Sequence, residues 1–548
     1  MKNLTPMQAA YWTGRQANGF LGNVSAHLYV EFDCGPIDPQ RLGEAVRKLY
    51  ETHGMMRMRI TADGGQDIVN AEESLSYAIE DLRELDADAL DRHMERKRQE
   101  WTCRTLDLTA GQTSAFELSL LPDGNSRLHV DTDMTAIDPP SFCLLMEDLA
   151  RFYDSPEINA RDAETGFFDW LDRKNSDAEL ARKLPEDKRW WQSRLADLPP
   201  APKLPAIAAS GEVRSGRLAA MLTSEERGSL ERSARDLRIT PSALMLGLFA
   251  AVIARATGDE RFRLNVPMFW RAPYTPDVER TVGDFSNILI LAVAPPPDES
   301  LRSLCKSLAE QMVDLLAHSA YPGVSVMRDL SRTRRSLQTA PVVFTSGLDL
   351  PAGDLFSPRV IRVFGPMIWA VSQGPQVALD AQVAHMDGGI LINWDIRYDA
   401  LPENWINTAF DSYLTLVREI AADPAVLDRP AFSSRTPAHS AGWHESPTEG
   451  MLKELLGRLA PGMSTHATGK IRELGLSEGD LSSIVAFINR YIPAAALSLD
   501  DIGPASTAGT IAGLLKARSG GASEKVGRAY LDAVDTRKRA SLDAQPAE

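Results

Sequence analysis

The first 175 residues alternate between stretches with helical spacing of apolar residues and stretches in which apolar and polar residues alternate. Residues 38–60 predict a helix followed by a strand, because apolar side chains recur three and four positions apart before Gly54: Leu42, Ala45, Val46 and Leu49. Residues 113–133 predict a β-hairpin, since two alternating runs flank the turn sequence PDGN. This mixture predicts an α/β unit.

A second mixed unit follows a proline-rich tether over residues 188–207. An apolar-faced helix is predicted there, with Thr240 and Pro241 suited to its start and Gly258 to its end. Strands are predicted in FRLNVPMFW, NILILAVAP, APVVFTSGLDL and the long stretch PQVALDAQVAHMDGGILINWDIRY. A helix over residues 405–421 is expected to close the unit.

The pattern therefore divides the chain into two lobes, a linker, a helical segment and a tail. Two α/β lobes are expected over residues 1–175 and 176–435, and their similar size suggests a duplicated fold although no sequence repeat is visible. The polar, turn-rich residues 432–450 predict a linker. Residues 451–520 are helical in pattern, and residues 521–548 predict a flexible tail.

Composition and charge narrow the class of protein. The chain has 548 residues, of which 44% are hydrophobic and 24% charged, as in ordinary globular proteins of several domains. No apolar run reaches the ~18 residues of a membrane span, and no signal-peptide core occurs, so we expect a cytoplasmic protein without a membrane partner. The net charge of −16 disfavours nucleic acid. We expect no metal site and no disulfide, because the cysteines lie far apart without CxxC spacing: Cys34, Cys103, Cys143 and Cys305.

Two carboxylates mark the junction between a predicted strand and a predicted helix. Asp133 and Asp138 lie there five residues apart, Ser141 follows three residues later, and no histidine stands between the two aspartates. From the residues alone, both carboxylates are capping or salt-bridging groups that hold the loop. For Asp138 this interpretation is favoured, because the two prolines that follow it suit the first positions of a helix.

Seven motifs resemble the heterocyclisation domains of nonribosomal peptide synthetases, relatives of condensation domains in the chloramphenicol-acetyltransferase-like superfamily. They occur in the family's order within residues 1–435: LTPMQAAYWTGR, THGMMR, DMTAIDPPS, LNVPMFWRAP with VGDFSN, PVVFTSGL, SQGPQVALDAQ and INWDIRYDALP. The resemblance implies two acetyltransferase-like α/β lobes that form a V-shaped pseudo-dimer, plus a small C-terminal helical domain. It also implies a central tunnel, which we expect Asp133, Thr345 and Asp380 to border.

The third motif departs from that of ordinary condensation domains, which carry HHxxxDG. Asp133 stands at the first histidine and Met134 at the second, while Asp138 keeps the aspartate and Pro139 replaces the glycine. The near-neutral proton acceptor of an imidazole is therefore missing. A well-placed amine can still attack a thioester, because positioning alone removes much of the barrier. Two roles stay open for Asp133, namely placing the acceptor substrate or pairing with an arginine.

Cyclisation after amide formation needs a proton shuttle elsewhere. A hydroxyl or thiol must add to the new carbonyl, and water must then leave, which a carboxyl group beside a hydroxyl can assist. The resemblance implies that Asp380 is the acid/base and that Thr345 hydrogen-bonds the intermediate. Taken in isolation, a Thr and an Asp at these positions would by default be interpreted as strand-end polar groups satisfied by backbone.

Further binding residues are suggested around the tunnel. The resemblance places Arg271 and Asn287 at substrate-binding positions. Gln373, Gln376 and Gln382 cluster around Asp380 with alternating spacing, so some share its face of a strand. These glutamines either orient Asp380 and bind substrate or satisfy buried backbone groups.

The C-terminal segment resembles a carrier domain from its second helix onward. Carrier domains attach phosphopantetheine to a serine that opens this helix, but here Leu481 stands at that position, and Ser482 is one residue off. A helix turns about 100° per residue, so Ser482 would point differently. We therefore expect no phosphopantetheine attachment and a degenerate carrier-like module; a small helical bundle with chance similarity is the alternative.

The resemblance implies an enzyme that condenses a carrier-bound acyl or aryl thioester with a carrier-bound Cys, Ser or Thr. It would then cyclodehydrate the product to a thiazoline or oxazoline, as in siderophore or other secondary-metabolite biosynthesis. Phosphopantetheine would arrive on partner peptidyl or aryl carrier proteins or other synthetase subunits, and a separate adenylation enzyme would activate the substrates. The alternatives are an amide-forming condensation enzyme without cyclisation and a non-catalytic carrier-binding scaffold.

Overall fold

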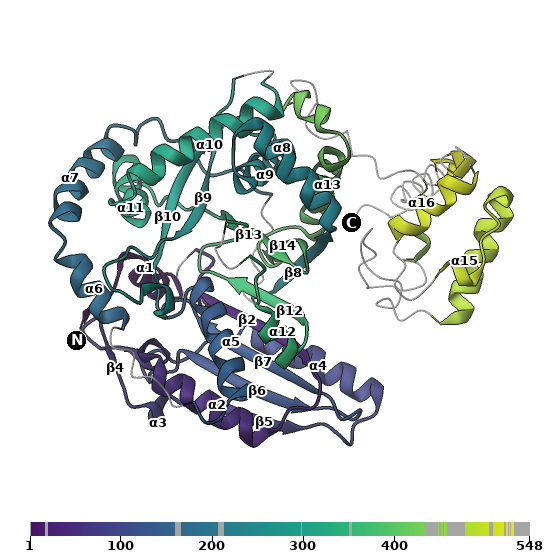
Figure 1. The fold of residues 1–548 in the computed structure, drawn as a ribbon. Helices are drawn as coiled ribbons and strands as arrows, with labels where there is room; N and C mark the ends of the chain where they lie inside the picture. The colour runs from purple at the N-terminus through teal and green to yellow at the C-terminus, as the bar shows by residue number, and fades with distance from the viewer. Residues whose placement is uncertain are drawn as a thin grey trace, which may run out of the picture. The chain divides into compact units, whose positions relative to one another are not determined.

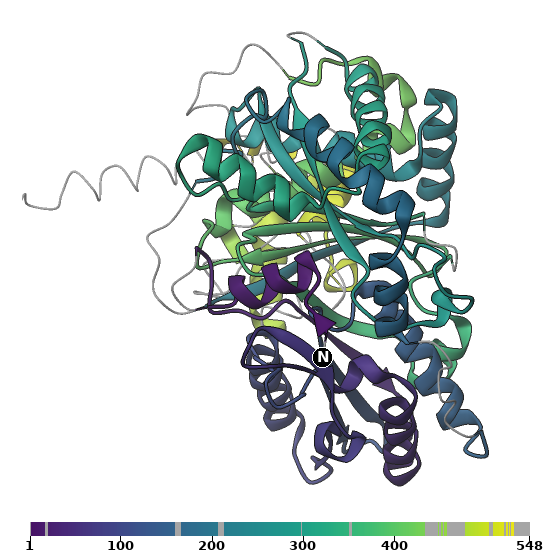
Figure 2. The same cartoon turned by 90° about the vertical axis from the view of Figure 1, so that its left-hand side faces the viewer.

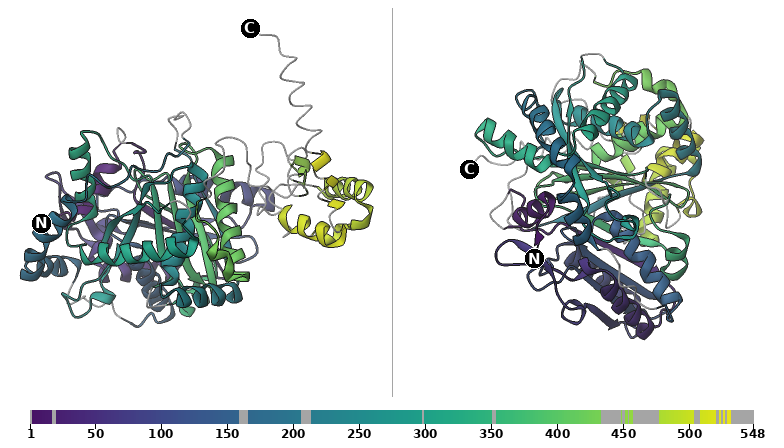
Figure 3. Two further views of the ribbon diagram at one scale, coloured as in Figure 1. Left: turned by 90° about the horizontal axis from the view of Figure 1, so that it is seen from above. Right: turned by 60° about the vertical axis from the view of Figure 1, so that its left-hand side comes forward.

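The chain forms two compact units, Met1–Ser434 and Arg435–Glu548. In this computed structural model the described residues are 2–16, 20–158, 166–205, 213–296, 299–349, 353–432, 477–502 and 508–519, with short pieces within 448–456 and 522–530. The first unit contains two lobes, whose sheets are seen one above the other in the right-hand view of Figure 3.

The N-terminal lobe is built on a five-stranded sheet. Its strands in spatial order are β12 (Met367–Gln373), β2 (His27–Cys34), β7 (Ser126–Asp133), β6 (Ser114–Leu120) and β5 (Tyr77–Asp81). One face packs against α2 (Pro39–Thr52), α5 (Pro139–Asp154) and α12 (Pro358–Phe364), and the other against α4 (Ala87–Thr102) (Figure 1). The predicted hairpin is confirmed as the antiparallel pair β6–β7.

Smaller elements complete this lobe. A three-stranded sheet consists of β1 (Lys2–Asn3), β4 (Gly65–Ile68) and β3 (Met58–Ile60), with α3 (Ala71–Ser74) and the 3-10 turn η1 (Gly54–Arg57) beside it in the sequence. Helix α1 (Pro6–Gly14) lies between the two lobes (Figure 2). It starts at Thr5, whose hydroxyl accepts from the backbone of Gln8 in a capping box.

The C-terminal lobe is built on a six-stranded sheet. Its strands in spatial order are β10 (Ser286–Val293), β9 (Phe262–Phe269), β11 (Val342–Gly347), β13 (Leu379–Met386), β14 (Gly389–Arg397) and β8 (Ser215–Leu222). One face packs against α8 (Ser224–Leu237), α9 (Pro241–Thr257), α10 (Leu301–Ala317) and α13 (Glu403–Ala422), while α11 (Gly323–Arg334) lies against β10. Helices α6 (Phe167–Asn175) and α7 (Ala178–Gln192) precede this lobe, and the 3-10 turns are η2 (Val278–Arg280) and η3 (Pro424–Asp428).

Helix α9 begins and ends as its sequence predicts. The Thr240 hydroxyl accepts from the backbone of Ala243, and Gly258 ends the helix in the left-handed conformation at φ 71°. No single helix among the described residues is long and apolar enough to cross a bilayer. The bent helix pair α8–α9 matches a membrane span by length and composition only, and most of α9 is buried in the core of its lobe.

One segment of the second half of the chain crosses into the first lobe. Strand β12 pairs antiparallel with β2 and so joins the N-terminal sheet, and α12 packs on α5 and so belongs to the N-terminal lobe. The expected division at residue 175 is wrong for this segment, because the edge of that sheet is completed by a distant strand. Gly365 makes the crossing possible: its φ is +73°, and an added Cβ would lie 2.1 Å from the carbonyl oxygen of Asp33.

A buried polar cluster, called the clasp below, joins the two lobes through Asp138, Ser141 and Arg271. Asp138 caps α5 by accepting from the backbone of Ser141 at 2.8 Å, and its second oxygen accepts from the backbone of Phe285 at 3.0 Å. Arg271 donates to Asp138 at 3.2 Å and to the Ser141 hydroxyl at 2.7 Å. The Ser141 hydroxyl in turn donates to the carbonyl of Gly283 at 2.8 Å. The capping role expected for Asp138 is therefore present, and the cap reaches across to the second lobe.

The second unit is helical in its described part. It contains α15 (Glu478–Tyr491), α16 (Ala508–Ser519) and the 3-10 turns η5 (Pro493–Ala495) and η6 (Leu499–Asp501). Its core includes Ile484 and Ile488 of α15 and Ile511 and Leu515 of α16. Most of the predicted linker, and residues 531–548 of the predicted tail, lie outside the described residues.

We expect Asp138→Ala to lower the free energy of unfolding by about 3 kcal/mol, because it leaves the guanidinium of Arg271 buried and unpaired and removes the cap of α5. Denaturant titration followed by tryptophan fluorescence measures this. Asp428→Asn is the control, since Asp428 pairs with Arg302 at the surface and such pairs contribute about 0–1 kcal/mol. Equal denaturation midpoints for the two variants would contradict a stabilising role of the clasp.

Candidate active site

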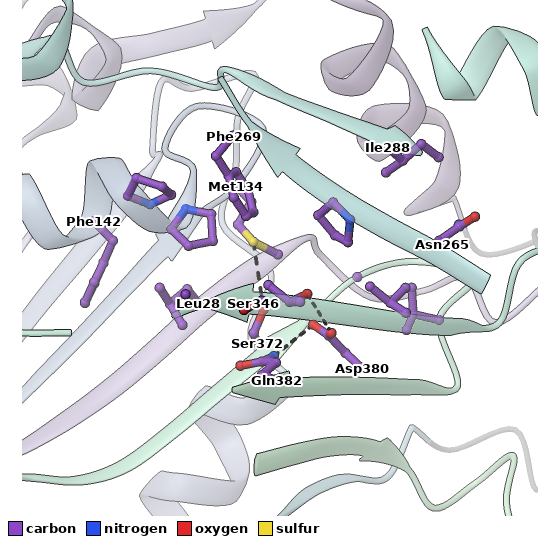
Figure 4. Close-up of a pocket in the computed structure, with 18 of the residues that line it drawn as sticks. Leu28, Met134, Phe142, Asn265, Phe269, Ile288, Ser346, Ser372, Asp380 and Gln382 are labelled. Atoms are coloured by element: carbon purple, nitrogen blue, oxygen red, sulfur yellow. Dashed lines mark hydrogen bonds between the residues drawn. The ribbon is translucent and has the colours of Figure 1, made fainter. Parts of the chain in front are cut away.

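A cavity of about 290 Å3 lies between the two lobes of the first unit. Its N-terminal side is mostly apolar, with Leu28 of β2, Met134 of the junction and Phe142 of α5 among its walls (Figure 4). Its C-terminal side is the open face of the six-stranded sheet, where polar side chains gather. The cavity therefore places a polar floor beneath an apolar chamber.

Thr345 and Asp380 meet on this floor. Thr345 lies on β11 and Asp380 on the neighbouring parallel strand β13, and the Thr345 hydroxyl donates to Asp380 Oδ1 at 2.9 Å. Both residues line the cavity and are partly exposed to it. Along β13 the side chains alternate, so that Leu379 and Ala381 enter the core while Asp380 faces the cavity. The structure thus brings together the two residues expected to support cyclodehydration.

Gln382 extends this pair into a network. Its amide nitrogen donates to Asp380 Oδ2 at 2.8 Å and to Asp395 Oδ2 at 2.9 Å, and the first bond is dashed in Figure 4. Its amide oxygen accepts from Asn393 at 2.9 Å. Gln382 therefore contacts Asp380 directly, as expected for a residue that orients it.

Asp395 and Arg217 complete the network. Arg217 on β8 donates to both oxygens of Asp395 on β14, at 2.7 and 2.8 Å. Burial and the nearby charge of Asp395 raise the pKa of Asp380 to about 7, against the opposing effects of Gln382, Thr345 and Arg217. A carboxyl group in this range can both donate and accept a proton near neutral pH.

The strand-to-helix junction presents Met134, and not Asp133, to the cavity. Asp133 is fully buried, pairs with Arg15 at 3.3 Å and accepts from the backbone of Thr135 at 2.9 Å. Burial raises the pKa of Asp133 even though Arg15 opposes this shift. The expectation that Asp133 borders the shared cavity is wrong, because its carboxylate turns into the loop to meet Arg15. Of the two roles left open by the sequence for Asp133, the structure shows the second, pairing with an arginine.

Arg271 and Asn287 do not line the cavity either. Arg271 is held in the clasp with Asp138 and Ser141, and its guanidinium also stacks 4.2 Å from the ring centre of Phe285. Asn287 donates to the carbonyl of Ser319 and accepts from the backbone of Gly323, both at 3.1 Å. Arg271 joins the two lobes and Asn287 fastens a loop of the C-terminal lobe, so the expected substrate-binding role is not supported for either.

The two remaining glutamines differ in position. Gln376 lines the cavity on a loop where its φ is +67°. Gln373 points away from it, donating to the Ser215 hydroxyl at 2.8 Å and lying 3.4 Å from His27. Of the three glutamines expected around Asp380, Gln382 and Gln376 therefore face the cavity.

Sequence reasoning did not single out Asp395, Arg217 and Asn393. A signal was present, because the turn at Asp387 and Gly388 sets the register of the β13–β14 hairpin. Counting outward from that turn places Asp395 opposite Asp380 and Asn393 opposite Gln382. Arg217 had no such signal, since its strand is separated from the hairpin by more than 150 residues.

Several proteins of known identity are similar to this chain. The phenyloxazoline synthase MbtB of Mycolicibacterium paratuberculosis is 42% identical over 431 residues, covering 77% of this chain and 36% of that protein. The pyochelin synthetase PchE of Pseudomonas aeruginosa is 33% identical over 421 residues, covering 76% of this chain and 29% of that protein. The chain thus spans about a third of the length of these curated relatives.

Solved structures agree with these relatives. The cyclization-docking bidomain of EpoB from Sorangium cellulosum superposes with a TM-score of 0.70 at 27% identity, covering 77% of this chain and 84% of that one. The two-lobed α/β fold expected from the motifs is confirmed by this similarity. The sequence model of the condensation domain matches residues 1–431, most of the chain, and the chain therefore belongs to the condensation-domain family.

Proposed function

We propose that this protein is a heterocyclisation enzyme of nonribosomal peptide synthesis. It joins a carrier-bound acyl or aryl thioester to a carrier-bound cysteinyl, seryl or threonyl residue and converts the amide to a thiazoline or oxazoline. The observation that carries this proposal is the Thr345–Asp380 pair on the cavity floor, with a carboxyl group whose pKa lies at about 7. The names of two relatives, a phenyloxazoline synthase and a pyochelin synthetase, support it.

Amide formation relies on placement of the two thioesters. The cavity wall carries the thioether of Met134 at the position of an imidazole in ordinary condensation domains, and a thioether cannot take up a proton near neutral pH. The free amine attacks the thioester carbon, the C–S bond to the donor carrier breaks, and the amine proton leaves with the thiol. Holding both reactants in the cavity supplies the rate enhancement.

Cyclodehydration runs through Asp380. Asp380 starts protonated and donates its proton to the amide oxygen, which becomes a hydroxyl group, as the acceptor's thiol or hydroxyl adds to the new amide carbon. The proton of that thiol or hydroxyl then passes to the carboxylate of Asp380. Asp380 then protonates that hydroxyl, the C–O bond breaks and water leaves. The nitrogen proton returns to the carboxylate as the C=N bond forms, so one water is lost overall. Thr345 holds the carboxyl group in position through its hydrogen bond.

The apolar chamber suits an aryl or other apolar acyl donor. Leu28 and Phe142 form its wall from the N-terminal lobe, and Phe269 closes it from β9 (Figure 4). Burying an aromatic ring against such side chains is favourable at about 25 cal/mol per Å2 of apolar surface. The polar floor is left to the acceptor, whose thiol or hydroxyl reacts there.

The substrates arrive on carrier domains outside the described units, after activation by an adenylation enzyme. In the C-terminal unit, Leu481 packs against the hydrophobic core of that unit, at the position where a carrier domain would hold its phosphopantetheine serine. The Ser483 hydroxyl donates to the carbonyl of Gly479 in the preceding helical turn. This supports a carrier-like module that holds no prosthetic group.

We expect Asp380→Asn and Thr345→Ala to release mainly uncyclised amide, with heterocycle formation slowed by about 10²–10⁴-fold for Asp380→Asn because its proton transfer is lost. Mass spectrometry of carrier-bound products measures the result as loss of one water. Asp387→Asn is the matched control, since Asp387 is exposed at the far end of β13 in a conformation that asparagine accepts. Normal heterocycle from Asp380→Asn would refute the proton shuttle.

The rate of water loss should fall as the pH rises through about 7. Asp380 is protonated below its pKa of about 7 and can then donate to the leaving oxygen, whereas above that pH the carboxylate cannot. The carrier-bound amide, supplied as starting material, isolates this step from condensation. A rate that rises across the neutral range would contradict the acid role.

A promiscuous phosphopantetheinyl transferase should leave the protein unmodified, because leucine at residue 481 offers no oxygen nucleophile. Intact-mass measurement after incubation with coenzyme A tests this, and Leu481→Ser is the variant expected to restore the attachment position. An adduct on Ser482 or Ser483 of the unaltered protein would overturn the degenerate-carrier interpretation.

A further inference from the structure

Asp380 on the cavity floor has a second carboxylate beside it, Asp395, which the chemistry proposed above does not use. Asp380 on β13 and Asp395 on β14 are direct partners in the antiparallel register, on the same face of the sheet. Side chains at such positions have Cβ atoms about 4.5–5.5 Å apart. Two negative charges at that separation repel each other, so their surroundings decide which of them carries a proton.

The surroundings of the two carboxylates are unequal. Asp395 accepts two hydrogen bonds from Arg217, one from the backbone of Ser372 at 2.8 Å and one from Gln382 at 2.9 Å. Asp380 accepts from the neutral groups of Thr345 and Gln382. Charge-assisted and bidentate bonds are the stronger kind, so the negative charge is fixed on the Asp395 side of the pair.

Gln382 transmits this arrangement to Asp380. Its amide oxygen accepts from Asn393. This bond turns the N–H groups of Gln382 toward the carboxylates, one to each. The orientation of the Gln382 amide is thereby set, and Asp380 is held at a constant position relative to Asp395. Substrate binding need not reorganise these groups before the proton moves.

We propose that Arg217 and Asp395 are positioning residues for cyclodehydration: their ion pair holds a fixed negative charge against Asp380, which makes Asp380 the group that carries the exchangeable proton. This inference rests on the proposed function. Neither residue is required to touch the reacting atoms of the substrate, and both act through Asp380.

Other charged or titratable groups also lie near Asp380. Tyr11 of α1 lines the cavity, and burial raises the pKa of its phenol above the ordinary value, so it stays neutral in the neutral range. Arg397 follows Asp395 on β14 but pairs with Asp399, at 2.7 and 2.8 Å. Among the described residues around Asp380, Arg217 and Asp395 therefore dominate its electrostatic environment.

The proposal predicts opposite effects for the two members of the ion pair. In Asp395→Asn the negative charge disappears while Arg217 remains, so the pKa of Asp380 falls and the pH profile of water loss moves to lower pH by about 1 pH unit or more. In Arg217→Gln the two carboxylates repel each other without compensation, so a proton is retained to higher pH and the profile moves upward. A purely structural role would lower the rate in both variants without moving the profile.

The experiment uses the 548-residue chain, a carrier-bound uncyclised amide and single-turnover mass spectrometry across the neutral pH range. Arg302→Gln and Asp428→Asn are the matched controls: they break a surface ion pair that does not line the cavity and should keep the profile of the unaltered protein. Circular dichroism confirms folding. If Arg217→Gln fails to fold, the direction of the shift in Asp395→Asn decides alone.

The outcomes separate the two proposals. If the unaltered protein leaves the amide uncyclised at every pH, the proposed function fails. If it forms heterocycle but Asp395→Asn keeps the same pH profile, or moves it upward, the positioning role fails while the proposed function stands. Opposite displacements in Asp395→Asn and Arg217→Gln support the positioning role.

Discussion

Burial of carboxylates between the two lobes is the constraint on which this structure depends. A buried carboxylate is costly unless it is paired, and three of them here are each paired with an arginine. Asp133 pairs with Arg15 and fastens the loop after β7. Asp138 pairs with Arg271 in the clasp between the lobes. Asp395 pairs with Arg217 at the edge of the larger sheet. Asp380 accepts hydrogen bonds from the neutral Thr345 and Gln382, and burial together with the nearby charge of Asp395 raises its pKa to about 7.

The same constraint separates the carboxylates that hold the backbone in place from the one proposed to transfer protons. The paired carboxylates position backbone: Asp138 caps α5 and binds the backbone of Phe285, and Asp133 binds the backbone of Thr135. The loop between them can then present Met134 to the cavity as an apolar wall. Asp380, the carboxyl group proposed for proton transfer, lies on the opposite side of the cavity, on a strand of the six-stranded sheet.

Two separate connections hold the lobes together. Strand β12 completes the N-terminal sheet although it comes from the second half of the chain, and Ser372 on that strand donates its backbone N–H to Asp395 of the other lobe. The clasp around Asp138 makes the second connection. Because the network beneath Asp380 includes a group from the shared strand, a shift between the lobes would disturb the site directly.

The sequence by itself determined the two mixed α/β units, the ends of α9 and the β6–β7 hairpin, because these depend on local periodicity and capping residues. Thr345 and Asp380 were expected at the site because their motifs resemble those of the family, and the structure places them in contact. The register of the β13–β14 hairpin was also readable, and with it the position of Asp395. The tertiary structure alone decided that Asp133, Arg271 and Asn287 turn away from the cavity, that β12 crosses into the first lobe and that Arg217 reaches Asp395. Those outcomes depend on contacts between residues far apart in the chain, for which local sequence patterns carry no signal, and on the pairing that each buried charge requires.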